Sequence, residues 1–106
     1  MSKALVKNAA DENQVKSARN KTDREREQQI ADLKFLLSTA QGRRYLWRLL
    51  EHCHVFGSIW RPSAEIHHLS GKQDVGHFVL AEITEANADS FLTMMKEAKE
   101  RKENGQ

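Results

Sequence analysis

The chain has 106 residues, of which 39% are hydrophobic and 30% charged, and its formal net charge is +2. At this length one domain with a small core is expected, and folding combined with association stays open. The sequence argues against a membrane-spanning protein, because no stretch approaches the ~20 apolar residues of a membrane span. It argues against a secreted protein, because no N-terminal hydrophobic run indicates a secretory signal. The lone Cys53 cannot form an internal disulfide, which indicates a reducing compartment.

The charges are unevenly distributed along the chain. The net charge is +2 over residues 1–29, +3 over residues 30–62 and −3 over residues 63–106. The centre is therefore basic and the C-terminal part acidic. An asymmetry of this kind can orient self-association or dock a nucleic acid.

Residues 1–29 form a polar segment with few large apolar side chains, namely Leu5, Val6 and Val15. Such a segment buries too little surface to offset its ordering entropy. We expect a flexible arm, or a helix that forms only on a partner. The charged residues around Glu25 and Glu27 are able to extend the next helix backwards.

Two helices with almost no connection between them should follow the arm. Apolar residues at three- and four-residue spacing predict a helix over residues 23–37 and another over residues 39–55. Ser38 is the predicted N-cap of the second helix, in a capping box with Gln41, and Gly57 suits its C-terminal end. We expect a sharp angle between these helices. The predicted buried residues are Ile30, Leu33, Leu36 and Leu37 in the first helix and Leu46, Leu49, Leu50 and Cys53 in the second.

A connector over residues 58–62 ends at Pro62, which disfavours helix at the residue before it. Ser63 is the predicted cap of one long helix that continues to residue 85. Gly71 and Gly76 lie inside this helix, so it either kinks near Gly71 or is closely approached by another part of the chain at Gly76. Its apolar stripe consists of Ile66, Leu69, Gly76, Val79, Leu80 and Ile83.

Asn87 is the predicted cap of a last helix, with Phe91, Met94, Met95 and Ala98 as its apolar stripe. No strand pattern and no internal repeat is visible. The sequence therefore predicts an all-α fold, a compact bundle of about four helices behind a polar, disordered N-terminal arm. The predicted divisions are a flexible arm (1–29), a helical domain (30–102) and a frayed tail (103–106).

Catalytic and metal chemistry find little support in the sequence. His52, Cys53 and His54 are adjacent, so on a helix they point about 100° apart and cannot share one ion. Cys53 falls on an apolar stripe, where a buried cysteine acts as a small hydrophobe. No carboxylate pair stands out, and Gly71 and Gly76 lack the spacing of a phosphate-binding loop. We expect no catalytic residue, no metal and no cofactor.

The strongest functional candidates are Arg43, Arg44, Trp47 and Arg48, which lie beside Tyr45 on the second helix. Arginine next to aromatic residues can grip phosphate and stack on bases. The same pairing is enriched at protein interfaces, and it also covers small cores. Nucleic-acid binding, protein binding and coverage of the core therefore all stay open for these residues. No helix-turn-helix signature is present in the sequence.

Two blocks of this sequence resemble the signature of a family of small tailed-phage proteins typified by a Bordetella phage protein, the Bbp-nineteen-like family. The first block consists of Leu36-Leu37-Ser38-Thr39, Gly42-Arg43-Arg44, Leu46-Trp47-Arg48-Leu49-Leu50 and Val55-Phe56. The second consists of Ser70-Gly71-Lys72, Val75-Gly76 and Leu80-Ala81-Glu82-Ile83. The resemblance spans about residues 32–98. It implies a product of the phage structural module, carried near portal, capsid and terminase genes, and implies no enzyme activity.

The expected function is therefore non-enzymatic: a head-assembly or minor virion protein that acts through protein–protein association. The expected partners are phage portal or capsid-module proteins or a second copy of the chain, with no membrane, and the expected location is the virion or the host cytoplasm. The alternative is a small nucleic-acid-binding phage protein that uses the Arg/aromatic face of the second helix.

Overall fold

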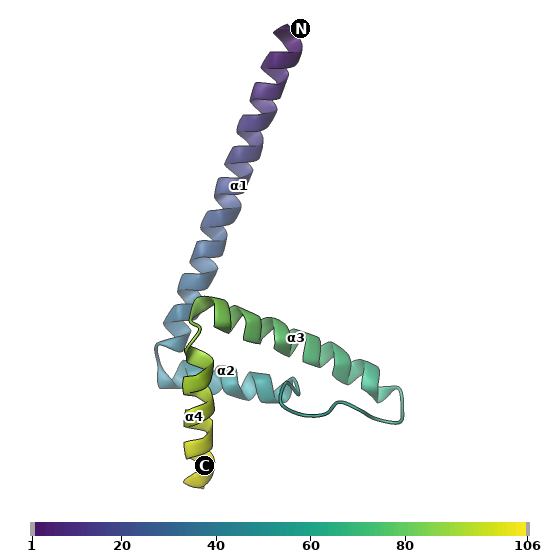
Figure 1. Cartoon of the computed structure of the whole chain (residues 1–106), viewed down its shortest axis with the longest axis vertical. Coiled ribbons are helices and arrows are strands. Elements are labelled where there is room, and N and C mark those ends of the chain that lie inside the picture. Colours follow the sequence, from purple (N-terminus) through teal and green to yellow (C-terminus); the bar gives the residue numbers. More distant parts are fainter. Residues whose placement is uncertain (1, 106) are drawn as a thin grey trace.

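A computed structural model describes the backbone of residues 2–105 and the side chains of residues 11–105. No strand occurs in this described part of the chain, so the predicted all-α class is confirmed. Residues 1 and 106, and the side chains of residues 2–10, lie outside the description. The helices are α1 (Ser2–Leu37), α2 (Ala40–His52), α3 (Glu65–Ala86) and α4 (Ser90–Glu103), arranged as Figure 1 shows.

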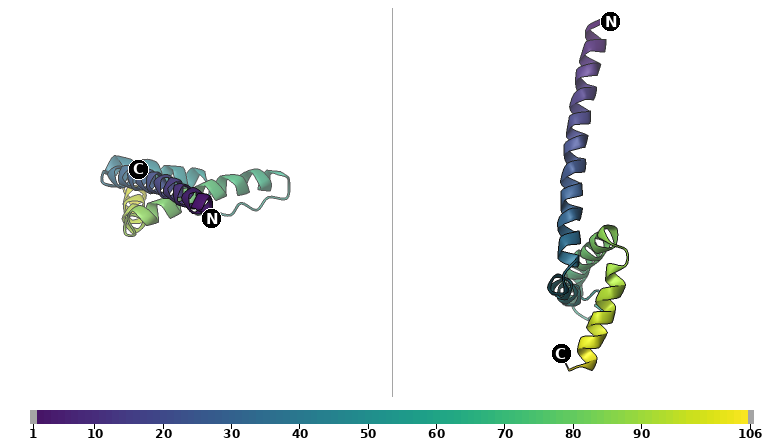
Figure 2. Two further views of the ribbon diagram at one scale, coloured as in Figure 1. Left: turned by 90° about the horizontal axis from the view of Figure 1, so that it is seen from above. Right: turned by 90° about the vertical axis from the view of Figure 1, so that its left-hand side faces the viewer.

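Helix α1 extends through the predicted arm and projects far out of the domain formed with α2, α3 and α4 (Figures 1 and 2). Its start at Ser2 lies well before the predicted start at residue 23. Residues 2–22 contain no glycine or proline, so nothing in them interrupts a helix. Every described side chain from residue 11 to residue 25 is exposed. The architecture of helices behind a polar arm is thus confirmed, while the flexibility of the arm stays a prediction.

The corner between α1 and α2 is sharp, as predicted, but its cap is Thr39 rather than Ser38 (Figure 1). Thr39 has the extended backbone that an N-cap requires, with φ −115° and ψ 147°, and its side chain accepts a hydrogen bond from the Gly42 N–H at 3.0 Å. The Ser38 hydroxyl instead donates to the carbonyl of Phe35 at 2.6 Å. Ser38 therefore closes α1 and Thr39 opens α2.

Helix α2 ends at His52, and its cap is formed by His54 instead of the predicted Gly57. His54 has a left-handed backbone with φ 58°. Its N–H donates to the carbonyl of Glu51 at 3.0 Å, and the N–H of Val55 donates to the carbonyl of Leu50 at 3.2 Å. These two bonds form a Schellman motif, which needs a left-handed residue at this position. Histidine is among the residues that tolerate that conformation.

Helix α3 is continuous through Gly71 and Gly76, in agreement with the prediction of one long helix. A side chain at Gly76 would collide with Cys53 and Val55, whereas nothing lies within 4 Å of a side chain placed at Gly71. Gly76 thus lets the end of α2 approach α3 closely. The N-cap of α3 is Ala64, which makes no side-chain capping bond, rather than the predicted Ser63. The Ser63 hydroxyl lies one residue earlier and accepts from the Glu65 N–H at 3.4 Å.

The turn between α3 and α4 is held by Asn87, and α4 begins later than predicted, at Ser90. The Asn87 N–H donates to the carbonyl of Ile83 at 2.9 Å, and its side-chain oxygen accepts from the Asp89 N–H at 2.9 Å. Asn87 therefore ends α3 and shapes the turn, and α4 begins at Ser90, three residues after Asn87.

The core lies where all four helices meet. It consists of Leu37, Leu46, Leu50, Ile83, Ala86 and Met94, flanked by Ile30, Leu33, Trp47, Val55, Val79, Leu80 and Phe91. Two predicted core residues are wrong, because Leu36 is 45% and Met95 is 44% exposed. Each helix packs on one side only, so only a narrow stripe of residues faces the core, such as Ile30, Leu33 and Leu37 in α1. Leu36 and Met95 lie next to the stripes of their helices and stay exposed.

Candidate interaction surface

Helix α2 presents two chemically different faces. Leu46 and Leu50 are buried against the other helices. The outward face consists of Gln41, Arg44, Tyr45, Arg48 and Glu51, all exposed. Positions three, four and seven residues apart lie on one side of a helix. The spacing in the sequence therefore places the arginines and the tyrosine together on the outside of the domain.

Arg43 does not belong to this outward face. Its Nε lies 2.6 Å from Oε1 of Glu97 in α4, and Nη2 lies 3.3 Å from Oε2. Nη1 also donates to the carbonyl of Leu37 at 2.8 Å. The hydrogen bonds to Glu97 raise the pKa of Arg43, so the guanidinium keeps its charge. Arg43 thus ties the start of α2 to α4 and to the end of α1, and the structure separates it from the other candidates.

Trp47 is half-buried in an aromatic cluster. Its ring is stacked with Phe56 at a centroid distance of 4.6 Å and with Phe91 at 6.1 Å, and these two phenylalanines are 6.0 Å apart. Offset stacks of this kind add stability beyond the area that they bury. Trp47 is therefore both part of the packing and a rigid element beside the exposed face.

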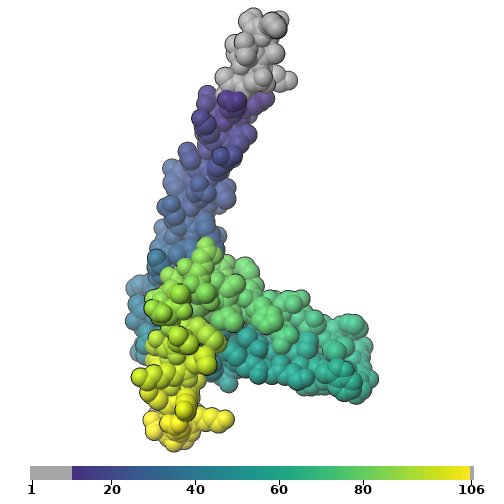
Figure 3. All heavy atoms as spheres, viewed as in Figure 1, coloured from purple at the N-terminus to yellow at the C-terminus, as the bar shows by residue number. Residues whose placement is uncertain are grey.

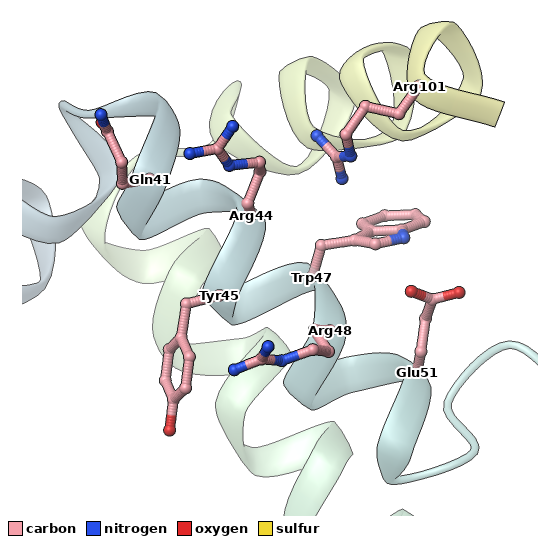
Figure 4. Close-up of a pocket in the computed structure, with 7 residues that line it drawn as sticks. All are labelled: Gln41, Arg44, Tyr45, Trp47, Arg48, Glu51 and Arg101. Atoms are coloured by element: carbon pink, nitrogen blue, oxygen red, sulfur yellow. The ribbon is translucent and has the colours of Figure 1, made fainter. Parts of the chain in front are cut away.

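A groove of about 440 Å³ runs between α2 and α4, open to solvent (Figure 4). Three cations line it: Arg44 and Arg48 from α2 and Arg101 from α4. The carboxylate in the lining is that of Glu51. The remaining lining residues are Gln41, Tyr45 and Trp47. The structure thus brings three of the four predicted surface residues, Arg44, Trp47 and Arg48, to one groove.

Sequence reasoning missed Arg101, the third cation of the groove. Its position in the last turn of α4 suggested only the usual favourable interaction with the helix dipole. Figure 4 shows Arg101 reaching from α4 toward the side of α2 that carries Trp47 and Arg44. Because it lies more than fifty residues from Arg44 in sequence, no local spacing connects the two.

Within the described side chains, Arg44, Arg48 and Arg101 form no ion pair with a carboxylate. Arg48 instead lies over the ring of Tyr45, with 5.5 Å between the guanidinium carbon and the ring centroid. The groove therefore carries positive charge that the described part of the chain does not neutralise by direct contact.

A comparison with protein-family profiles matches a family to this chain. The profile is described as Bbp19-like phage protein, and it matches residues 33–96. The chain belongs to the Bbp19-like phage protein family. Comparisons with curated proteins and with solved structures gave no match.

The part of this Bbp19-like protein that matches the family runs from the last turn of α1 into the middle of α4. It includes the α1–α2 corner, the core and the α2 side of the groove. Arg101 and the projecting part of α1 lie outside the match. The resemblance to this family over about residues 32–98 is thereby confirmed over residues 33–96.

Three further observations concern the described residues of the Bbp19-like chain. No group of three histidine, cysteine or carboxylate side chains among them could hold a metal ion. Cys53 is 4% exposed and lies against Gly76 at the contact between α2 and α3. None of the described helices has the length and apolar character needed to cross a membrane.

Proposed function

We propose that this phage protein acts without catalysis, through protein–protein association in head assembly or as a minor component of the virion. Its partners would be portal or capsid-module proteins or a second copy of the chain. It would work in the virion or in the host cytoplasm. Membership of a phage protein family supports a role in a phage, and the exposed apolar surface supports association with other proteins as the activity.

The observation that carries the proposal is the number of large hydrophobic side chains left outside the core. Among residues 11–105, eight hydrophobic residues are buried, whereas ten large ones are at least 44% exposed. The exposed ones are Val15, Phe35, Leu36, Tyr45, Phe56, Trp60, Val75, Phe78, Leu92 and Met95. They occur on all four helices and in the α2–α3 connector. Large apolar side chains that no other helix covers are candidates for burial against a partner, and contiguous apolar patches mark such sites.

The shape of the molecule agrees with this interpretation. The radius of gyration is 20.9 Å, and the extents are 73 × 39 × 16 Å. A compact chain of this length would have a radius of gyration of about 13 Å. Figure 3 looks along the shortest dimension of the molecule and shows α3 and α4 in front, with α1 projecting from the domain. A thin body of this kind gives each helix a side that no other helix covers.

Quantitative mass spectrometry of purified virions and procapsids tests the proposal. We expect the protein in at least one of these particles, at a fixed ratio to the portal or capsid protein. Chemical crosslinking before digestion should join its exposed faces to one of these neighbours. Absence from virions and procapsids alike would falsify the proposal.

Nucleic-acid binding is the second candidate, and the groove is the observation that favours it. Three arginines beside Tyr45 and Trp47 offer phosphate contacts and an exposed aromatic ring. If three phosphates are neutralised, the affinity for duplex DNA should fall about 40-fold between 50 and 200 mM salt. Arg44→Ala should then reduce the salt slope by about one unit. Fluorescence anisotropy with labelled DNA measures both, and a salt-independent signal would exclude this candidate.

A further inference from the structure

We infer that the groove between α2 and α4 is a docking site for an acidic segment of a partner protein. Carboxylates of the segment would pair with Arg44, Arg48 and Arg101, and an apolar side chain of the segment would lie against Trp47 and Tyr45. This inference rests on the proposed function in association and names the chemistry of the partner.

The first argument is the contrast between two sets of arginines in the same molecule. Arg26 and Arg43 each form ion pairs with carboxylates of α3 or α4 at distances near 2.6 Å. Arg44, Arg48 and Arg101 form none within the described side chains, although Arg101 is half-buried. Partial burial of an unpaired cation costs free energy. A carboxylate delivered by a partner would remove that cost.

The second argument is that the groove combines an aromatic ring anchored by stacking with charged side chains. Trp47 is fixed by its stacks with Phe56 and Phe91, and the Tyr45 ring is held beside the Arg48 guanidinium. Preorganised side chains lose little conformational entropy on binding. Guanidinium groups bind carboxylates through paired hydrogen bonds, and arginine with tryptophan or tyrosine dominates the energy of many interfaces. The groove therefore has the composition of a protein-binding site.

The third argument favours an acidic peptide over a nucleic acid. Glu51 lies inside the groove, and Glu97 and Glu100 line the adjoining hollow together with Arg44 and Arg101. Phosphates recur at every nucleotide, so a backbone running along the groove could not avoid these carboxylates, whereas a peptide can place neutral or cationic residues opposite them. The stacks with Phe56 and Phe91 already occupy Trp47, which leaves less of its ring for a base. A short segment with a few carboxylates, and with one cation for Glu51, fits this pattern of charge.

The experiment uses Trp47 as the reporter of the groove. The chain has two tryptophans, and Trp60 is 66% exposed in the α2–α3 connector, so Trp60→Phe leaves Trp47 as the remaining fluorophore. The probe is a synthetic peptide in which pairs of glutamate alternate with single leucines and one central position carries lysine, the cation for Glu51. A matched peptide with glutamine in place of glutamate, and a DNA duplex, are titrated in the same way. We expect a saturable change in Trp47 emission with the glutamate peptide and none with the other two.

Charge-reversal variants in the same full-length chain locate the binding. Arg44→Glu and Arg101→Glu should each weaken binding of the glutamate peptide by about tenfold, since each replaces an attraction by a repulsion. Lys99→Glu is the matched control, because it makes the same change of charge on an exposed residue of α4 outside the groove lining. This variant should bind within about twofold of the parent, and circular dichroism checks that all variants are folded.

Three results would overturn the inference. The first is no response to the glutamate peptide, and the second is an equal loss in Lys99→Glu and Arg101→Glu, which would indicate unspecific attraction. The third is a groove-dependent response to DNA without one to the peptide, which would favour the nucleic-acid alternative. Virion mass spectrometry is independent of these results. Peptide binding with absence from particles would therefore contradict the head-assembly role while leaving the groove assignment intact.

Discussion

Three helical glycines of this protein have very different surroundings. A Cβ at Gly42 would collide with the carbonyl oxygen of Leu36, which belongs to the backbone and cannot move aside cheaply. A Cβ at Gly76 would collide with the side chains of Cys53 and Val55. At Gly71 the space is open. The first two glycines therefore permit the α1–α2 corner and the α2–α3 contact, and the third has no such role.

Alanine substitutions should separate these roles. Gly42→Ala and Gly76→Ala should each lower the free energy of unfolding by about 1–3 kcal/mol, because an added methyl overpacks a closed contact. Gly71→Ala should raise it by about 1 kcal/mol, because alanine favours helix and nothing obstructs it. Urea unfolding followed by circular dichroism measures all three. A Gly42→Ala variant as stable as the parent would contradict the tight corner.

The helices are joined by two arginine clamps as well as by the core. Arg43 of α2 binds Glu97 of α4, with both side chains about one quarter exposed or less. Arg26 of α1 binds Glu82 and Glu85 of α3, and the hydrogen bonds to Glu82 and Glu85 raise its pKa. Both arginines therefore stay charged through the neutral range. The second clamp lies inside the predicted arm, so α1 contacts the domain before residue 30.

A double-mutant cycle measures the α2–α4 clamp. Arg43→Ala, Glu97→Ala and the double variant should give a coupling free energy of about 1 kcal/mol, reduced by salt. Arg44→Ala is the neighbouring control. It should change the free energy of unfolding by less than about 0.5 kcal/mol, since Arg44 has no ion pair within the described side chains. Equal effects of Arg43→Ala and Arg44→Ala would show that the clamp contributes nothing.

On the scale of the whole molecule, the described side chains in the projecting part of α1 lie outside the core. All described side chains from residue 11 to residue 25 are exposed, and the first contact with another helix is made by Arg26. The described part of the arm therefore lengthens the molecule and contributes no side chain to the core.

Removal of residues 2–22 tests this separation. The truncated chain should unfold with a free energy within about 1 kcal/mol of the full-length value, because the core residues of the described part begin at Ile30. The helical signal at 222 nm should fall in proportion to the helix removed. Size-exclusion chromatography with light scattering should show whether association changes. A large loss of stability would mean that the arm belongs to the folded unit and that the boundary at residue 30 is wrong.

Much of the fold was predictable from the sequence because its determinants are local. Apolar spacing is enough to predict Leu46, Leu50, Ile83 and Met94 as core residues, since a helix brings positions three and four apart to one side. The cost of glycine inside a helix left two options open, a break or kink near Gly71 or a close approach at Gly76, and the structure shows the close approach. The caps were harder to predict, because the adjacent residues Ser38 and Thr39 carry the same hydroxyl chemistry. Only the backbone angles decide which of them opens α2.

The sequence by itself determined that this protein is a small helical phage protein with an exposed Arg/aromatic face on α2. Only the tertiary structure decided how the arginines divide. Arg43 meets Glu97, 54 residues away, and is used for packing, whereas Arg44 joins Arg48 and Arg101 in a groove between two helices. Periodicity assigns a residue to one side of its own helix. The position of a distant helix decides whether that side meets a carboxylate, an aromatic ring or solvent.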